Sequence, residues 1–210
     1  MYARSIVVDH LIRWESETVA VAWIYCDYKQ QQKQTVLQLI ASVLRQLILH
    51  QSAPSDNVKK FYKEYHDNLQ SSPTITEVVK VLQAEITTYS RVYIITDALD
   101  ECLEGNQQEL VKTLQRLTGA NLMFTSRPLA LIGEILEGIA RLDISANTND
   151  VGKYVNGRIS EDSRLSRLVK KEPALRADII NTIVNNVRGM YVFLTTNTCT
   201  RSGVYMVDTV

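Results

Sequence analysis

The chain has 210 residues, of which 45% are hydrophobic and 22% are charged, a composition typical of a soluble globular protein with one well-formed core. Its 23 Lys and Arg residues balance its 23 Asp and Glu residues, so no overall field draws the chain to nucleic acid or to an anionic membrane. No apolar run approaches the roughly 20 residues of a membrane span, and the start of the chain is too polar for a signal peptide. We therefore expect a cytoplasmic protein with no nucleic-acid partner and no membrane partner.

The three cysteines, Cys26, Cys102 and Cys199, are odd in number and far apart in the sequence. They do not have the spacing of metal ligands, and the three histidines do not cluster with them. We expect reduced thiols.

Strand and helix patterns alternate up to about residue 145. A helix is expected over 2–14, a strand over 19–26, and a strongly amphipathic helix over 36–48. Thr74 and Glu77 form a capping-box signature for a helix that ends near residue 87. The other elements expected in this part are helices over 57–66, 107–117 and 129–137, and strands over 92–95, 121–125 and 140–144.

From residue 147 onward the pattern is helical throughout, with helices expected over 150–159, 163–170 and 174–188. The segment 195–210 is rich in hydroxyl and β-branched residues and is a poor helix former. We expect an α/β core over 1–146 with a parallel sheet flanked by helices, a helical extension over 147–194, and a loose tail over 195–210.

A cluster of carboxylates follows the apolar run from Val92 to Ile95. Such a run is typical of a buried parallel strand, and Asp97 then lies at its carboxyl end, where open α/β sheets place their ligands. Asp100 and Glu101 follow after a short apolar step. This is the layout of a Walker B segment, in which the first acid binds Mg²⁺ and a later one orients or polarises the attacking water.

The segment Thr125-Ser126-Arg127-Pro128 follows the next expected strand. It brings Thr125 and Arg127 to the same edge of the sheet, where the guanidinium could contact a γ-phosphate with two hydrogen bonds. The alternative is that all these groups are solvent-facing loop charges and that Arg127 merely pairs with a carboxylate.

The phosphate-binding motif G-x-x-x-x-G-K-[ST] is absent from the sequence. Gly133 and Gly138 have its glycine spacing, but Ile139 and Ala140 follow in place of the Lys and the hydroxyl residue. Losing on the order of four hydrogen bonds to phosphate, at roughly 1.5–3 kcal/mol each, removes ~6 kcal/mol or more. Micromolar binding totals only about 8 kcal/mol, so we expect this chain alone to bind ATP or GTP barely or not at all.

Four segments of the chain resemble the NACHT family of STAND P-loop NTPases, specifically the fungal group whose nephrocystin-like N-terminal region precedes ankyrin or other repeats. They are AWIYCDY at 22–28, the helix over 36–47, the acidic strand over 92–102, and NLMFTSRP at 121–128. The helical segments near 150–159 and 179–190 also look like those of the family, so the resemblance extends over about 3–193.

The resemblance implies that Asp97 binds Mg²⁺, that Asp100 and Glu101 are the hydrolytic acids, and that Thr125 and the sensor residue Arg127 contact the nucleotide. The family hydrolyses ATP or GTP slowly and uses the nucleotide state to switch oligomerisation and signalling. Expected cofactors are therefore Mg²⁺ and ATP or GTP, with none bound if the chain is too short to hold them. Expected partners are other proteins or further copies of the chain.

The chain departs from the family at its start, because Met1 stands where the phosphate loop should end. The resemblance therefore implies a domain truncated before that loop and lacking the first central strand, through a shortened or mispredicted reading frame or a natural short form. Loss of that strand should leave 121–125 uncovered or make 140–144 pair there directly.

Two functions compete on these grounds. The first is a fragment of a nucleotide-dependent signalling switch that is inactive as an isolated NTPase. The second is a non-catalytic interaction or regulatory module derived from a NACHT protein. A metal-dependent phosphatase or nuclease built on the same acids is weaker, because no second metal shell is evident.

Overall fold

The computed structural model describes residues 6–13, 15–67, 72–127, 129–144, 148–187 and 202–208. The chain divides into two compact units. Met1–Leu142 together with Gly203–Val210 form one unit, and Asp143–Ser202 form the other.

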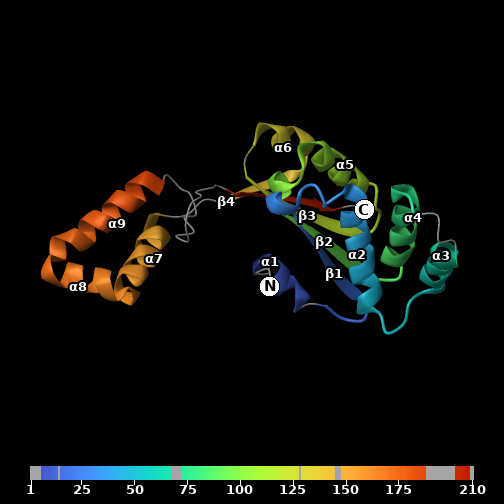
Figure 1. Cartoon of the computed structure of the whole chain (residues 1–210), viewed down its shortest axis with the longest axis horizontal. Coiled ribbons are helices and arrows are strands. Elements are labelled where there is room, and N and C mark those ends of the chain that lie inside the picture. The colour runs from blue at the N-terminus through green and yellow to red at the C-terminus, as the bar shows by residue number, and fades with distance from the viewer. Residues whose placement is uncertain are drawn as a thin grey trace. The chain divides into compact units, whose positions relative to one another are not determined.

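The first unit is a mixed α/β domain built on a three-stranded parallel sheet (Figure 1). Strands β1 (Val19–Tyr25), β2 (Arg91–Asp97) and β3 (Ala120–Ser126) pair in that order and run parallel. The full sheet order is β1-β2-β3-β5-β4, with β5 (Ser202–Asp208) antiparallel to β3 and β4 (Ala140–Ile144) beyond it.

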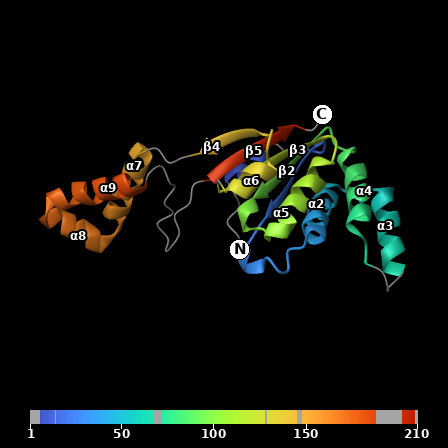
Figure 2. The same cartoon turned by 90° about the horizontal axis from the view of Figure 1, so that it is seen from above.

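Helices cover both faces of the three parallel strands. On one face α2, α4 and α5 lie side by side (Figure 2), and their apolar side chains form the main core with those of the strands. On the other face α1 packs through Val8 against Val21 and Ile95. The helices of this unit are α1 (Ile6–Ile12), α2 (Val36–His50), α3 (Asp56–Asp67), α4 (Ile75–Ile86), α5 (Glu104–Gln115) and α6 (Ala130–Ile135).

The sequence pattern explains why these elements form. The central strand β2 is covered on both faces, and Val92, Ile94 and Ile95 are at most 1% exposed. Helix α2 buries the stripe that its helical period predicts: Val36, Leu39, Ile40, Val43, Leu44 and Leu47. The expected capping box is also present, since Thr74 and Glu77 exchange hydrogen bonds at the start of α4.

One carboxylate lies in the core of this unit. Glu85 of α4 is 0% exposed, and its two oxygens accept hydrogen bonds from Ser55 and from Gln51. Because a buried charge is costly without such partners, this pair of bonds ties the end of α2 and the start of α3 to α4.

The expected elements agree with the structure to within a few residues. For example, α5 begins at Glu104 rather than at residue 107, and β2 covers Arg91–Asp97 rather than 92–95. Residues 2–5 and Trp14 of the first expected helix lie outside the described residues.

The expectation of a loose tail over 195–210 is wrong for the part that forms β5. This strand pairs antiparallel with β3 in the register Leu122↔Val207 and Phe124↔Tyr205. Strand β5 therefore covers the edge of β3, and β4 does not pair there directly as one expectation required. The physical reason is that an exposed strand edge presents unpaired backbone groups, which a β-prone segment satisfies.

Within its described residues, the second unit contains the helices α7 (Thr148–Glu161), α8 (Ser163–Lys171) and α9 (Pro173–Val187). Val151, Val155 and Ile159 of α7 form a small core with Val169 of α8 and the apolar face of α9. In the described part of the chain, no helix combines the length and the apolar character that crossing a membrane requires.

Candidate functional site

The acid that ends β2 is held by a residue near the end of β3. The Thr125 hydroxyl donates a hydrogen bond to Asp97 Oδ1, and the backbone N–H of Ala98 donates to the same hydroxyl oxygen at 3.0 Å. One side chain therefore joins the carboxyl ends of two neighbouring parallel strands. The contact described for the Asp97 side chain uses Oδ1 and leaves Oδ2 available to a ligand.

The chain reverses direction directly after Asp97. Ala98 has φ 57° and ψ 48°, which is the left-handed region that residues other than glycine rarely adopt. A short 3-10 turn, η2 (Leu99–Glu101), follows with Leu99 fully buried. Burial of Leu99 fixes this turn and directs Asp100 toward the end of β3.

Asp100 and Arg127 form the second link between these strand ends. The backbone N–H of Arg127 donates to Asp100 Oδ1 at 3.0 Å, and Arg127 Nε forms an ion pair with Asp100 Oδ2. The Asp100 side chain is 3% exposed and that of Arg127 is 41% exposed. The contacts described for Arg127 use its backbone N–H and Nε, so its two terminal amino groups are available to an anion.

Glu101 connects the acidic turn to the loop after β1. Its Oε2 accepts a long hydrogen bond of 3.4 Å from the Tyr28 N–H, and its carbonyl oxygen accepts one of 3.1 Å from the Gln31 side chain. Gln34 holds the same loop, because it accepts from the Asp27 N–H at 2.9 Å and donates to the Tyr25 carbonyl at 2.8 Å. The sequence shows only a polar segment here, and no spacing rule predicts that Gln34 has this role.

The structure therefore brings Asp97, Thr125, Asp100, Arg127 and Glu101 to one edge of the sheet. Within the described ranges, no group of three or more His, Cys, Asp or Glu side chains could hold a metal ion. Mg²⁺ bound with a nucleotide needs only one or two carboxylates besides phosphate and water, and Asp97 can supply one. The residues present therefore fit the carboxylate part of a Mg²⁺–nucleotide site, which Asp97 would supply.

Comparison with protein families matches residues 2–127 to the family described as Nephrocystin 3, N-terminal. The chain belongs to this family. The matched nephrocystin 3 N-terminal region contains all five residues of the edge and ends at Arg127, whereas the expected resemblance continued to about residue 193. The comparisons found no match among curated proteins and none among solved structures.

Two cysteines of the nephrocystin 3 N-terminal region lie next to the acidic residues at the carboxyl ends of the strands. Cys26 follows β1, Cys102 closes η2, and both are free and buried. The thiol of Cys26 donates a hydrogen bond to the sulfur of Cys102, which together with burial holds the pKa of Cys26 well above its usual value. The same hydrogen bond lowers the pKa of Cys102. Both thiols are free in the structure, and Cys199 lies outside the described residues.

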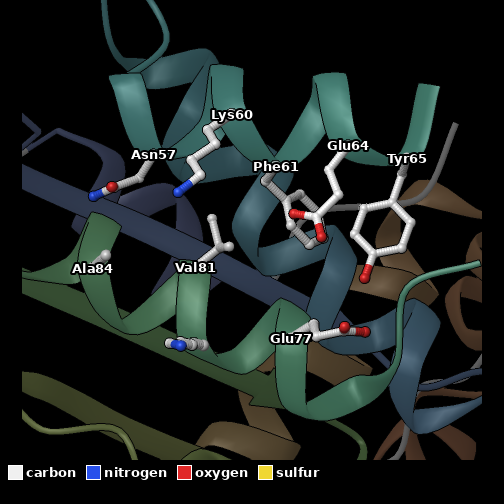
Figure 3. Close-up of a pocket in the computed structure, with 9 residues that line it drawn as sticks. Asn57, Lys60, Phe61, Glu64, Tyr65, Glu77, Val81 and Ala84 are labelled. Carbon is white, nitrogen blue, oxygen red and sulfur yellow. The ribbon is translucent and has the colours of Figure 1, made fainter. Parts of the chain in front are cut away.

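A groove between α3 and α4, also in the nephrocystin 3 N-terminal region, is separate from the edge (Figure 3). Its volume is about 350 Å³, and it is lined by Asn57, Lys60, Phe61, Glu64, Tyr65, Glu77, Lys80, Val81 and Ala84. The Tyr65 hydroxyl points across it from α3 and donates to Glu77 of α4. This bond raises the pKa of Tyr65 to about 12. Hydrogen bonds from Thr74 and then from Tyr65 lower the pKa of Glu77 to about 2.

Proposed function

We propose that this chain is a fragment of a nucleotide-dependent signalling switch of the NACHT type, within the STAND class of P-loop NTPases, and that it is inactive as an NTPase in isolation. The observation that supports the proposal is the meeting of Asp97, Asp100 and Arg127 at the carboxyl ends of adjacent parallel strands. Open α/β sheets bind their ligands at such an edge.

Different residues of the edge would contact different parts of a bound triphosphate. Asp97 would hold Mg²⁺, which neutralises charge on the phosphate oxygens when it is bound. The terminal amino groups of Arg127 would contact the γ-phosphate while Nε stays on Asp100. Asp100 then acts as a positioning residue, because Arg127 occupies both of its oxygens, and Glu101 is the acid that remains to orient water.

The proposal predicts weak nucleotide binding by the chain alone. Without backbone N–H groups and a lysine around the phosphates, the interaction rests on one guanidinium and one carboxylate. Hydrogen bonds to charged groups contribute about 1.5–3 kcal/mol each. Two to three of them give a dissociation constant on the order of millimolar.

Amide NMR of the ¹⁵N-labelled chain with Mg-ATP and Mg-GTP tests this directly. At millimolar nucleotide we expect changes in the amide chemical shifts of Ala98–Glu101 and Arg127, and we expect these changes to disappear in Arg127→Gln. The control is Arg116→Gln, which alters an exposed arginine at the end of α5 and should retain the changes. Shifts confined to other parts of the chain, or none at all, would refute the proposed site. Calorimetry that gives a micromolar dissociation constant would instead refute the weak nucleotide binding expected of the isolated chain.

A second function, a non-catalytic interaction or regulatory module, is favoured by one feature of the same edge. Asp100 is 3% exposed and both of its oxygens contact Arg127, so this ion pair leaves no Asp100 oxygen for a ligand or a catalytic water. On either proposal the partners are other proteins or further copies of this chain, in the cytoplasm. The NMR titration with Mg-ATP separates the two, since shift changes at Ala98–Glu101 and Arg127 support the switch and their absence supports the module. Phosphate release from ATP that is lost in Asp97→Ala would contradict both, because it would show an active enzyme.

A further inference from the structure

Helix α8 of the second unit carries four cations and no carboxylate along its length. The cations, which we call the cationic row, are all exposed: Arg164, Arg167, Lys170 and Lys171. Residues three and four positions apart lie above one another on a helix, so Arg164, Arg167 and Lys171 follow one line and Lys170 lies beside it. The row covers about two helical turns, or about 10 Å along the axis.

The other side of α8 holds the helix in its unit. Val169 is 7% exposed and packs into the small core with α7 and α9, which α8 connects (Figure 1). It comes two positions after Arg167, and residues two apart lie on opposite sides of a helix. Because the side of Val169 is packed, the cationic row is turned toward solvent.

The carboxylates that precede α8 are engaged elsewhere. Asp162 accepts two backbone N–H groups of the first turn of α8, at 2.8 and 2.9 Å, and Glu161 pairs with Arg158 at 3.1 Å. Among the described residues, no carboxylate forms an ion pair with the cationic row. The hydrogen bond described for a side chain of the row joins Arg167 Nε to the Ser163 carbonyl at 3.0 Å, within the helix. The described part of the chain therefore leaves these four charges for a partner.

The row surrounds a depression of about 530 Å³ whose lining also includes Leu168. Leu168 is 52% exposed and follows directly after Arg167. An exposed apolar side chain among four cations matches a partner that brings carboxylates and an apolar side chain together. An amphipathic acidic segment of a protein has this chemistry.

Two features favour such a segment over a lipid bilayer or a nucleic acid. Asp162 and Glu172 are exposed and lie directly before and after α8, so a continuous phosphate surface would bring negative charge against both of them. A helix that lies in a membrane interface inserts its apolar face, and the face of α8 that carries Val169 is already packed against its neighbours. A short acidic segment meets the row and avoids both problems.

We propose that the cationic row and Leu168 form a docking site for an acidic amphipathic helix of a partner protein. Carboxylates spaced three or four positions apart on that helix would pair with the row, and an apolar side chain between them would cover Leu168. The two arginines can each bind a carboxylate through two parallel hydrogen bonds. The site uses none of the residues at the nucleotide edge, so it stands or fails separately from the proposed function.

Amide NMR of the full ¹⁵N-labelled chain tests the site. The probe is a synthetic helical peptide that carries Glu at every third or fourth position with Leu between them, and the control peptide has Gln in place of each Glu. We expect shift changes at 163–171 with the acidic peptide, which diminish at high salt because exposed charges are screened. Changes confined to other parts of the chain, none at all, or equal changes with the Gln peptide would overturn the proposal.

Two variants with the same loss of charge sharpen the test. Removal of the row should weaken peptide binding by about tenfold or more, since four exposed pairs of small individual strength are lost together. This variant carries Arg164→Gln, Arg167→Gln, Lys170→Gln and Lys171→Gln. The matched control alters exposed lysines of α3 and α5 and should bind as the unaltered chain does. It carries Lys59→Gln, Lys60→Gln, Lys63→Gln and Lys112→Gln.

Equal affinities of the two variants would refute the docking site. If the first variant does not fold, as judged by circular dichroism, the location of the shift changes in the unaltered chain decides the question. Vesicles of phosphatidylserine with phosphatidylcholine, and polyuridylic acid, test the other anionic partners. At equal concentrations of negative charge, each should bind a smaller fraction of the chain than the acidic peptide does, and a larger fraction with either would overturn the choice of a protein partner.

Discussion

Arg127 contacts Asp100 twice, through its backbone N–H to Oδ1 at 3.0 Å and through Nε to Oδ2. The carboxylate is almost completely buried, whereas the guanidinium is partly exposed. One ion pair therefore both fixes the turn after β2 against the end of β3 and presents the remaining part of the guanidinium at the surface. Structure and candidate function depend on the same contact.

Arg127→Gln should lower the free energy of unfolding by about 1–3 kcal/mol, because a buried carboxylate loses its charged partner and keeps one backbone donor. Urea denaturation measures this loss. Arg116→Gln is the matched control, since Arg116 is exposed and such surface changes usually stay within about 0.5 kcal/mol. Equal losses in the two variants would show that the ion pair contributes nothing specific.

Thr125→Val should destabilise the domain by about 1–3 kcal/mol, since the substitution keeps the shape and leaves Asp97 Oδ1 and the Ala98 N–H without their shared partner. Thr125→Ser retains the hydroxyl and should lose clearly less. Thermal unfolding of both variants makes the comparison. A serine variant as unstable as the valine variant would point to the lost methyl group rather than the lost hydrogen bonds.

The features that the sequence predicted well depend on local periodicity. The buried stripe of α2, the capping box of Thr74 and Glu77, and the position of Asp97 at the end of β2 each follow from neighbours within a few residues. The arrival of Arg127 at the same edge followed from the rule that parallel strands share their carboxyl ends.

The features that the sequence did not predict depend on contacts between distant residues. The alternative that Arg127 pairs with a carboxylate is confirmed, but the choice of Asp100 as that carboxylate requires the chain reversal at Ala98, where no glycine marks a left-handed residue. Glu85 reads as an ordinary polar position of a helix, and only Ser55 and Gln51 explain its burial. Strand β5 was missed because a short β-prone segment becomes a strand only when an open edge is beside it.

Ala98→Gly should stabilise the domain by about 0.5–1 kcal/mol. Alanine in the left-handed region costs roughly 1–2 kcal/mol, and the greater freedom of glycine in the unfolded chain offsets part of the gain. Ala84→Gly makes the same chemical change inside α4 and should destabilise by about 1 kcal/mol. Urea unfolding of the pair should give opposite signs, and a loss of stability at both positions would contradict the strain inferred at Ala98.

The hydrogen bonds of Glu77 predict a dependence of stability on pH. The pKa of Glu77 is lowered from 4.5 to about 2 in the folded state, first by Thr74 and then by Tyr65. The folded state therefore favours the charged carboxylate, and its contribution to stability is fully present above pH 4.5 and is lost as the pH falls from 4.5 to about 2. Urea unfolding of the chain and of Glu77→Gln at several pH values measures this contribution as the difference between them.

The difference between the chain and Glu77→Gln should shrink across this window, because protonated glutamate and glutamine are similar as hydrogen-bonding groups. Tyr65→Phe is the control, since it removes one of the bonds that lower the pKa of Glu77. In this variant the lower limit of the pH range over which the Glu77 contribution is lost should move to higher pH. At the alkaline end the same bond raises the pKa of Tyr65 from 10.0 to about 12, so the stability it contributes is present below pH 10.0 and is lost as the pH rises toward 12. A difference that stays constant from pH 2 to pH 7 would show that the Glu77 carboxylate titrates alike in the folded and unfolded chain, and that the contact across the α3–α4 groove does not persist in solution.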